Sequence, residues 1–260
     1  MVRPEGGVWC GEAIDHPRPF VIRESTHRIH DPLIPGKLAR LGEALLLRPD
    51  QQVLDLACGS GEMLCTWARD HHITGVGVDL SSAFINSART RAAELAVSDR
   101  VHFEHGDAAS YVAPEPVDVA ACLGATWIGD GVLGTVDLLA RSLSDGGLIL
   151  VGEPYWLSVP ASDDLARACH ARDRDEWSTL PDLVSSLRRH GLDLVQMVLA
   201  DPDDWDAYHG LQWLNLRRWL DANPADELSA ELRSELDRAA ADHLVAREHL
   251  GWGVFALMPR

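Results

Sequence analysis

The segment 53–63, Val-Leu-Asp-Leu-Ala-Cys-Gly-Ser-Gly-Glu-Met, constrains the fold most, because an apolar strand leads through a turn of small residues into a helix. An apolar strand with one acid near its end, here Asp55, is typical of the middle of a parallel sheet, where only the carboxyl edge meets a ligand. Gly59 and Gly61 let the backbone turn tightly, and the following helix begins with unpaired N–H groups. The segment therefore predicts a ligand-binding loop, with an ordinary strand-to-helix turn as the alternative.

Strand and helix patterns alternate along the middle of the chain. Apolar runs predict strands at 53–57, 74–79, 101–105, 117–123 and 147–153. Helical spacing of apolar residues predicts helices at about 62–70, 82–97 and 133–143. This alternation is typical of βαβ units and predicts an α/β fold, with a mostly parallel sheet and helices on both faces.

The two ends of the chain follow a different pattern. Residues 1–32 are rich in Pro, Gly and charge and predict a loop or short cap outside the core, before a helix over 38–46. The alternation stops after Pro154, where an insertion with short helices is expected over 155–181. Further elements are expected as a helix at 181–190, a strand at 192–199, a helix at 203–221, a helix starting at Asn223-Pro224 and a last strand at 251–258.

The composition argues against several classes of protein. The formal net charge of −17 opposes binding to a phosphate backbone, so no nucleic-acid partner is expected. No apolar run reaches the roughly 18 residues of a membrane helix, and the first residues lack the apolar core of a signal peptide, so a cytoplasmic protein is expected. No Cys-x-x-Cys pair occurs, so neither a disulfide framework nor a metal site is expected. The five cysteines are Cys10, Cys58, Cys65, Cys122 and Cys169.

The spacing of the glycines indicates the kind of ligand. A dinucleotide-binding loop has a third glycine, which lets the helix pack closely on the strand while the pyrophosphate lies at the helix N-terminus. Here Gly61 is followed by Glu62, Met63 and Leu64, so that glycine is missing and an acid stands where phosphate would bind. A ligand without phosphate fits this loop better.

Further motifs follow at the ends of the later strands. Asp79 ends the run Gly-Val-Gly-Val-Asp, and a carboxylate there can accept both hydroxyls of a ribose. The run His-Gly-Asp-Ala-Ala follows at 105–109, an apolar strand from Asp118 ends near Leu123, and a Gly-Gly turn at 146–147 enters the fifth strand. With the glycine loop, these motifs resemble the class I S-adenosylmethionine-dependent methyltransferases over most of residues 50–155.

The resemblance implies a Rossmann-like sheet of seven strands, the last one antiparallel, with S-adenosylmethionine as methyl donor and S-adenosylhomocysteine as its product. Ala57 departs from the family, which often has its first glycine at this position. Asp107 would accept the adenine amine and Ala108 would pack near the ring, although a turn in which Asp107 bonds its own backbone has the same sequence. The implied cofactor residues are Asp55, Ala57, Cys58, Gly59, Gly61, Asp79, Leu80, Asp107, Ala108 and Leu123.

Within this family, the layout is nearest to bacterial small-molecule enzymes. The fourth strand is not followed by Asn-Pro-Pro-Tyr, with which amino-methyltransferases of nucleobases and glutamine amides grip a planar nitrogen. The chain is also similar to a bacterial group without an assigned substrate, marked by Ser-x-His-Arg-Ile-His near the start, Gly-Glu-Pro-Tyr-Trp and Arg-Arg-Trp-Leu. This second resemblance implies nothing about the methyl acceptor.

Four residues are candidate general bases for a methyl transfer, in which the protein aligns the nucleophile and removes its proton where needed. They are His27, His30, Glu153 and Tyr155. The histidines precede the core, where family members often place a lid, and an imidazole can deprotonate a substrate near neutral pH. Two surface histidines that tether the N-terminal segment are the alternative. Glu153 ends the fifth strand, at the edge where ligands bind in such sheets.

Aromatic residues indicate where an acceptor could bind. Trp127 and Trp156 stand at strand ends, and Tyr208 lies on a late helix, so their rings could line a pocket for an apolar or cationic acceptor. Packing of these rings into the core is the alternative for each of them. The predicted substrate-binding residues are Trp127, Trp156 and Tyr208.

Together these features predict a single domain over 1–260, with an N-terminal cap (1–48), a cofactor-binding core (49–153) and substrate-side insertions with the last strands (154–260). The expected activity is methyl transfer from S-adenosylmethionine to an N, O or C atom of a small molecule. Non-methyl chemistry of the same cofactor (aminocarboxypropyl transfer or cyclisation), a non-catalytic S-adenosylmethionine-binding protein and a dehydrogenase are the rivals. The sequence leaves the oligomeric state open, a homodimer included.

Overall fold

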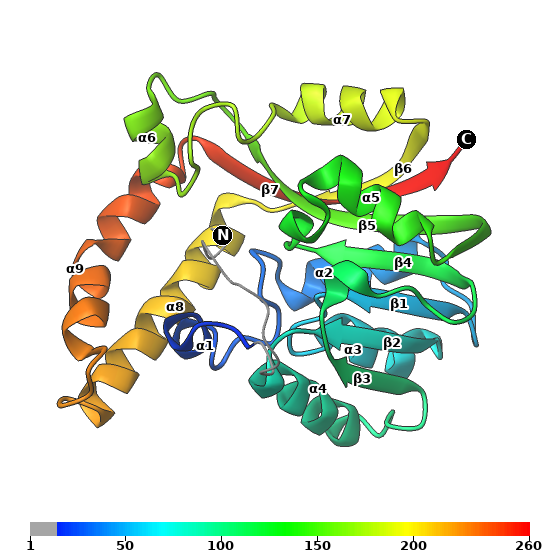
Figure 1. Cartoon of the computed structure of the whole chain (residues 1–260), viewed down its shortest axis with the longest axis horizontal. Helices are drawn as coiled ribbons and strands as arrows, with labels where there is room; N and C mark the ends of the chain where they lie inside the picture. Colours follow the sequence, from blue (N-terminus) through cyan, green and yellow to red (C-terminus); the bar gives the residue numbers. More distant parts are fainter. Residues whose placement is uncertain (1–14) are drawn as a thin grey trace.

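The structure, a computed structural model, describes residues 15–260 and contains one seven-stranded sheet in the order β3-β2-β1-β4-β5-β7-β6 (Figure 1). Neighbouring strands from β3 through β5 pair in parallel, whereas β7 pairs antiparallel with both β5 and β6. This confirms the predicted sheet. The strands are β1 (Gln52–Leu56), β2 (Thr74–Asp79), β3 (Val101–His105), β4 (Val117–Leu123), β5 (Leu143–Trp156), β6 (Leu192–Leu199) and β7 (Leu250–Pro259).

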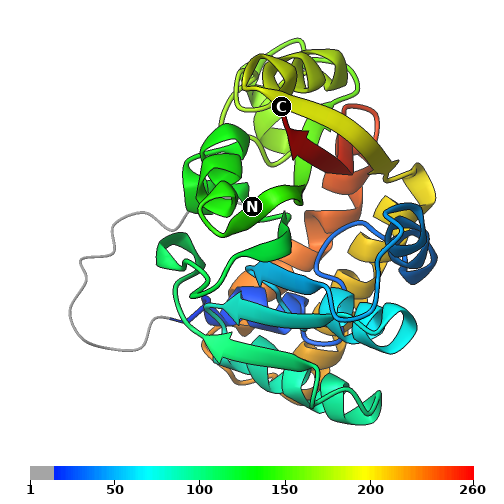
Figure 2. The same ribbon diagram turned by 90° about the vertical axis from the view of Figure 1, so that its right-hand side faces the viewer.

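Helices cover both faces of the sheet, as predicted (Figure 2). Apolar side chains of α2, α3 and α4 pack on one face, and those of α5 and α7 pack on the other. The helices are α1 (Arg18–Arg23), α2 (Pro35–Ala44), α3 (Glu62–His71), α4 (Ser82–Glu94), α5 (Val132–Ala140), α6 (Asp163–Ala168), α7 (Leu180–Arg189), α8 (Pro202–Ala222) and α9 (Ser229–Ala246), with short 3₁₀ turns η1 (Ala108–Ser110) and η2 (Thr126–Gly129).

The order of the strands locates the ligand-binding edge of the sheet. The chain runs outward from β1 through β2 to β3, then returns to place β4 on the other side of β1. In open parallel sheets, ligands bind outside the carboxyl ends of the strands at such a switch point. The loops after β1 and β4 meet there.

A helical layer stands beyond this edge and consists of α1, α6, α8 and α9 (Figure 1). Ile22 of α1 packs with Leu216 and Leu220 of α8. Asn215 of α8 donates a hydrogen bond to the carbonyl of Arg23 (2.7 Å). These contacts fix the segment that follows α1 over the carboxyl ends of β1 and β4.

In the N-terminal segment, Ile22, Glu24 and His27 are buried, and Ile22 packs against α8 and α9. One prediction about the later part of the chain is wrong. No helix starts at Asn223 in the described chain, because Asn223 ends α8: its side-chain amide donates to the carbonyl of Trp219 (2.8 Å), and α9 begins only at Ser229. Cys10 lies outside the described residues.

The described residues contain no helix long and apolar enough to span a membrane. Within residues 15–260, no group of three or more His, Cys, Asp and Glu side chains is arranged to hold a metal ion.

Candidate active site

The loop between β1 and α3 turns through three residues with positive φ: Ala57 (61°), Gly59 (53°) and Gly61 (69°). A Cβ on Gly61 would lie 2.6 Å from the ring of Phe103, so this position has neither the space nor the backbone conformation for a side chain. Ala57 adopts the same left-handed conformation at the position where related chains often have glycine. The loop therefore carries some backbone strain at Ala57.

Asp79 fastens this loop to the end of β2. One carboxylate oxygen of Asp79 accepts a hydrogen bond from the Gly59 amide, and the other accepts one from the Ser81 amide, both at 2.8 Å. Each oxygen keeps a second lone pair. Asp79 therefore shapes the loop and can still accept hydrogen bonds from a ligand.

In the turn after β3, the side chain of Asp107 bonds to the backbone of the same turn, which was the alternative to a contact with adenine. Oδ1 of Asp107 accepts a hydrogen bond from the Ala109 amide (2.9 Å) and caps η1, while Ala108 is buried. The Leu80 carbonyl lies 2.8 Å from Nε2 of His105. This turn and the end of β2 are adjacent, because β2 and β3 pair up to Asp79 and His105.

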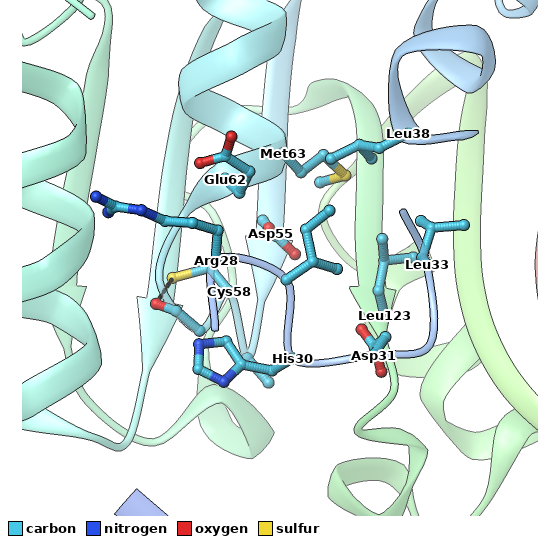
Figure 3. A pocket seen from close by; sticks show the side chains of 13 residues that line it. Arg28, His30, Asp31, Leu33, Leu38, Asp55, Cys58, Glu62, Met63 and Leu123 are labelled. Atoms are coloured by element: carbon cyan, nitrogen blue, oxygen red, sulfur yellow. Dashed lines mark hydrogen bonds between the residues drawn. The ribbon is translucent and has the colours of Figure 1, made fainter. Parts of the chain in front are cut away.

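A cavity opens between the loop after β1 and the segment that follows α1 (Figure 3). Five of the predicted cofactor residues line it: Asp55, Ala57, Cys58, Gly59 and Leu123. The segment after α1 contributes Arg28, Ile29, His30, Asp31 and Leu33, while Leu38 of α2 and Glu62 and Met63 of α3 complete the lining. The structure thus brings half of the predicted cofactor residues to one cavity. The other five lie along the same sheet edge: Gly61 in the glycine loop, Asp79 and Leu80 at the end of β2, and Asp107 and Ala108 after β3.

The N-terminal segment fits closely against two glycines of the sheet edge. A Cβ on Gly59 would lie 2.6 Å from Cδ2 of His30, and a Cβ on Gly124 would overlap the carboxylate of Asp31. In Figure 3, Asp31 lies beside Leu123. The glycines after β1 and β4 therefore make room for His30 and Asp31 as well as for the turns themselves.

Two carboxyl groups face this cavity without a hydrogen-bond or ion-pair partner among residues 15–260: Asp31 and Asp55. Burial raises the pKa of Asp55 well above its ordinary value, and the nearby charges of Asp79 and Asp31 raise it further. Burial also raises the pKa of Asp31 to about 7, against the opposing effect of His30. A cation that approaches either group would favour its ionised form.

Glu24 is the centre of a buried polar cluster between α1 and α8. Its Oε1 accepts hydrogen bonds from the Tyr208 hydroxyl (3.0 Å) and the Gln212 amide (2.6 Å). Its Oε2 lies 3.3 Å from Nδ1 of both His27 and His30. Burial acts to raise the pKa of Glu24, but its contacts with His30, His27 and Gln212 lower that pKa below its ordinary value. Glu24 is therefore held ionised between the two imidazoles.

The two histidines have different partners beyond Glu24. Nε2 of His27 lies 3.1 Å from the Tyr208 carbonyl, and burial lowers the pKa of His27. Nε2 of His30 lies 2.8 Å from the Ser60 hydroxyl in the glycine loop. His30 lines the cavity, whereas His27 does not. The chain Glu24–His30–Ser60 therefore links the helical layer to the loop after β1.

The remaining predicted catalytic residues lie on β5. Glu153 is buried and accepts a hydrogen bond from the Thr126 hydroxyl (2.5 Å), and burial raises its pKa to about 7. Tyr155 packs in the core against Gly251 of β7. Neither residue lines the cavity.

The three predicted substrate-binding residues do not line the cavity either. Trp156 is buried with Trp177 in a cluster beside α6 and α9, and its indole N–H donates to the Arg174 carbonyl (2.9 Å). Trp127 is half-buried in η2. Only Tyr208 touches the polar cluster next to the cavity.

Sequence reasoning missed Glu24 and Asp31. Asp31 directly follows the Ser-x-His-Arg-Ile-His motif and precedes Pro32, so its position next to this motif was the available signal. Glu24 directly precedes this motif in a segment without helical or strand periodicity. Its partners lie about 180 residues later in the chain.

Comparisons with known proteins agree with this geometry. A model described as "Methyltransferase domain" matches residues 53–147. The chain is 54% identical to the uncharacterized protein YjhP of Escherichia coli (strain K12), over 95% of this chain and all of that protein. A crystal structure of a SAM-dependent methyltransferase from Geobacter sulfurreducens, in complex with S-adenosyl-L-homocysteine, is 57% identical, with a TM-score of 0.94 over 95% of this chain and all of that one. The chain belongs to the S-adenosylmethionine-dependent methyltransferases.

The name of a more distant relative states the reaction of that relative. The 27-O-demethylrifamycin SV methyltransferase of Amycolatopsis mediterranei is 30% identical over 60% of this methyltransferase and 52% of its own length. This methyltransferase therefore spans about half of that relative.

The lining of the cavity complements the methionyl end of the donor of this family in its chemistry. S-adenosylmethionine carries a sulfonium and an ammonium group, and the cavity of this methyltransferase presents two unpaired carboxyl groups, Asp31 and Asp55. Its walls also include the apolar side chains of Leu33, Leu123 and Met63. Acids for the cationic end and apolar walls for the alkyl chain suit this molecule chemically.

Proposed function

We propose that this methyltransferase transfers a methyl group to an N, O or C atom of a small-molecule acceptor, which binds between the donor cavity and α8. This proposal rests on the fact that the sheet edge and the N-terminal segment line the same cavity. Asp55, Gly59 and Leu123 of the sheet edge face His30 and Asp31 of the N-terminal segment. A donor on the sheet edge would therefore have its reactive end toward the cluster around Glu24.

The donor residues have distinct roles in this proposal. Asp79 accepts the ribose hydroxyls through its remaining lone pairs, with Leu80 beside it. Asp107 and Ala108 hold the adenine at the end of β3. The methionyl part lies against Asp55 and Leu123 and against the loop that contains Ala57, Cys58, Gly59 and Gly61. Hydrogen bonds from hydroxyls to an ionised carboxylate are among the stronger kinds, so Asp79 should dominate ribose recognition.

His30 is the proposed general base, because it is the one candidate base of the described residues that lines the cavity. Glu24 orients its ring and stabilises the imidazolium that forms when it takes a proton, and Ser60 holds the other nitrogen before the acceptor binds. Methyl transfer is an in-line displacement, so alignment of the acceptor is the main task of these residues. His27, Glu153 and Tyr155 remain predictions of the sequence for this role.

The acceptor side is formed by Tyr208 and Trp127 in this proposal, with Trp156 as a buried support behind α6. A small organic acceptor is favoured by the net charge of −17, which disfavours nucleic acid. The rifamycin methyltransferase among the relatives also acts on a small molecule by its name. A single domain over 1–260, a bacterial cytoplasmic location and a homodimer remain predictions.

Product analysis tests this proposal. The protein is incubated with S-adenosylmethionine and pools of phenols, amines and acidic carbon compounds, and the products are identified by mass spectrometry. Methylated acceptor together with S-adenosylhomocysteine supports methyl transfer. Methylthioadenosine would instead indicate aminocarboxypropyl transfer, and tight donor binding without turnover of any acceptor would favour a non-catalytic binding protein.

A further inference from the structure

The strongest unexplained feature of the described chain is the pair of partnerless carboxyl groups, Asp31 and Asp55, in one cavity. They come from different parts of the chain, β1 and the segment before α2. Cationic side chains nearby are already paired. Arg28 contacts Glu94 (3.2 Å), and Arg91 binds Glu62 through two hydrogen bonds of 2.8 Å.

Asp55 is buried and Asp31 is half-buried. A carboxyl group taken out of water either keeps its proton or meets a cation. A ligand that fills the cavity would displace water from both groups, so a cation on that ligand is the partner that they lack. The methionyl end of S-adenosylmethionine has two cations, the α-ammonium and the sulfonium. S-adenosylhomocysteine keeps the ammonium but has a neutral sulfur, because the methyl group leaves with the positive charge of the sulfonium.

The position of Asp31 matches the sulfonium rather than the ammonium. The methyl group must face the acceptor, so the sulfur lies between the methionyl end and the acceptor. Asp55 lies on β1 beneath the glycine loop, whereas Asp31 lies against Gly124 at the end of β4. Asp31 also directly follows His30, which contacts Glu24 of the acceptor-side cluster.

We propose that Asp31 pairs with the sulfonium of the bound donor, so that the site selects S-adenosylmethionine over S-adenosylhomocysteine. This inference rests on the proposed placement of the donor in this cavity. It makes Asp31 a specificity residue that favours exchange of spent product for fresh donor. Asp55 then pairs with the ammonium, which both molecules carry.

Other ionisable groups also act on Asp31. His30 and Glu24 face it from its own segment, Asp55 from β1, Cys122 from β4 and Tyr208 from α8. Burial raises the pKa of Asp31 to about 7. A cation beside the carboxylate would favour its ionised form, so donor binding is coupled to release of a proton and product binding is coupled less strongly.

The test is calorimetric titration of the full chain with S-adenosylmethionine and, separately, with S-adenosylhomocysteine. The variants are Asp31→Asn and, as a matched control at an exposed position, Asp145→Asn. Asp31→Asn should weaken donor binding about tenfold or more and change product binding by less than about threefold, whereas Asp145→Asn should change neither. An equal loss for both ligands, or no loss for the donor, would overturn the inference.

The wild-type protein provides a test that needs no variant. Its preference for donor over product should rise from about pH 6 to about pH 8, as Asp31 loses its proton more readily. Titrations in two buffers of different ionisation enthalpy should show more protons released with the donor than with the product. Equal proton release for the two ligands would contradict the role of Asp31 alone, and no donor binding at all would also overturn the proposed function.

Discussion

Asp31 occupies the space that a side chain on Gly124 would need, so the segment after α1 and the end of β4 interlock. Gly124 also has a positive φ of 76°. Gly124 thus permits the turn after β4 and also leaves the space that the carboxyl group of Asp31 occupies beside the cavity.

Gly124→Ala should therefore destabilise the protein by about 1–3 kcal/mol and weaken donor binding, because Asp31 has to move and the alanine adopts a strained conformation. Urea unfolding and calorimetric titration measure the two effects. Gly36→Ala is the control, since a Cβ on Gly36 would meet no neighbouring atom within 4 Å and the residue has no positive φ. Wild-type stability and affinity in Gly124→Ala would contradict the interlock.

Ala57→Gly should increase the free energy of unfolding by about 0.5–1 kcal/mol, because glycine adopts the φ of 61° without strain. Urea unfolding monitored by tryptophan fluorescence measures this change. Ala93→Gly, at an exposed position inside α4, should decrease the same free energy by about 1 kcal/mol. A loss of stability in both variants would show that the loop conformation at Ala57 is not strained.

Glu24→Gln should lower kcat about tenfold or more, because the ring of His30 loses the carboxylate that orients it. Glu24→Asp should restore part of the rate, and the affinity for the donor should change little. Glu43→Gln, at an exposed position on α2, is the matched control. An unchanged kcat in Glu24→Gln, or a loss of kcat that Glu24→Asp does not partly restore, would contradict this positioning role.

Glu153 should make stability depend on pH in a defined direction. Its pKa in the folded state is raised to about 7, so its contribution is fully present below the ordinary value of 4.5 and is lost as the pH rises through about 7. Glu153→Gln keeps an acceptor for the Thr126 hydroxyl and removes the charge. The variant should gain up to about 3 kcal/mol over wild type between about pH 5 and about pH 8. Urea unfolding at the two pH values checks this, and an equal difference at both would contradict the buried charge.

The turns and strand ends that are proposed to hold the cofactor could be located from the sequence because their signals are local. The turn at Gly59 and Gly61 directly follows β1, and Asp79 ends a strand of recognisable pattern, so neighbouring residues were enough to locate them. The mostly parallel sheet of seven strands with an antiparallel last strand could be predicted from the alternation of strands and helices together with the family resemblance.

The acceptor half could not be predicted in the same way. Asp31 lines the cavity and Glu24 lies in the polar cluster beside it, and both are held there by the packing of α1 on α8, a contact between segments about 190 residues apart. Tyr155 was expected at the ligand edge, but β7 lies between β5 and β6 and places Gly251 against its ring. Pairing of distant segments decides both outcomes, and no local pattern encodes it.

Titration of the full chain with S-adenosylmethionine, for wild type and for Asp79→Ala, measures whether the donor binds at this edge of the sheet. We expect one donor molecule bound per chain, with affinity reduced about tenfold or more in Asp79→Ala and unchanged in Asp145→Asn. The absence of binding at millimolar S-adenosylmethionine, together with binding of a nicotinamide cofactor, would contradict it.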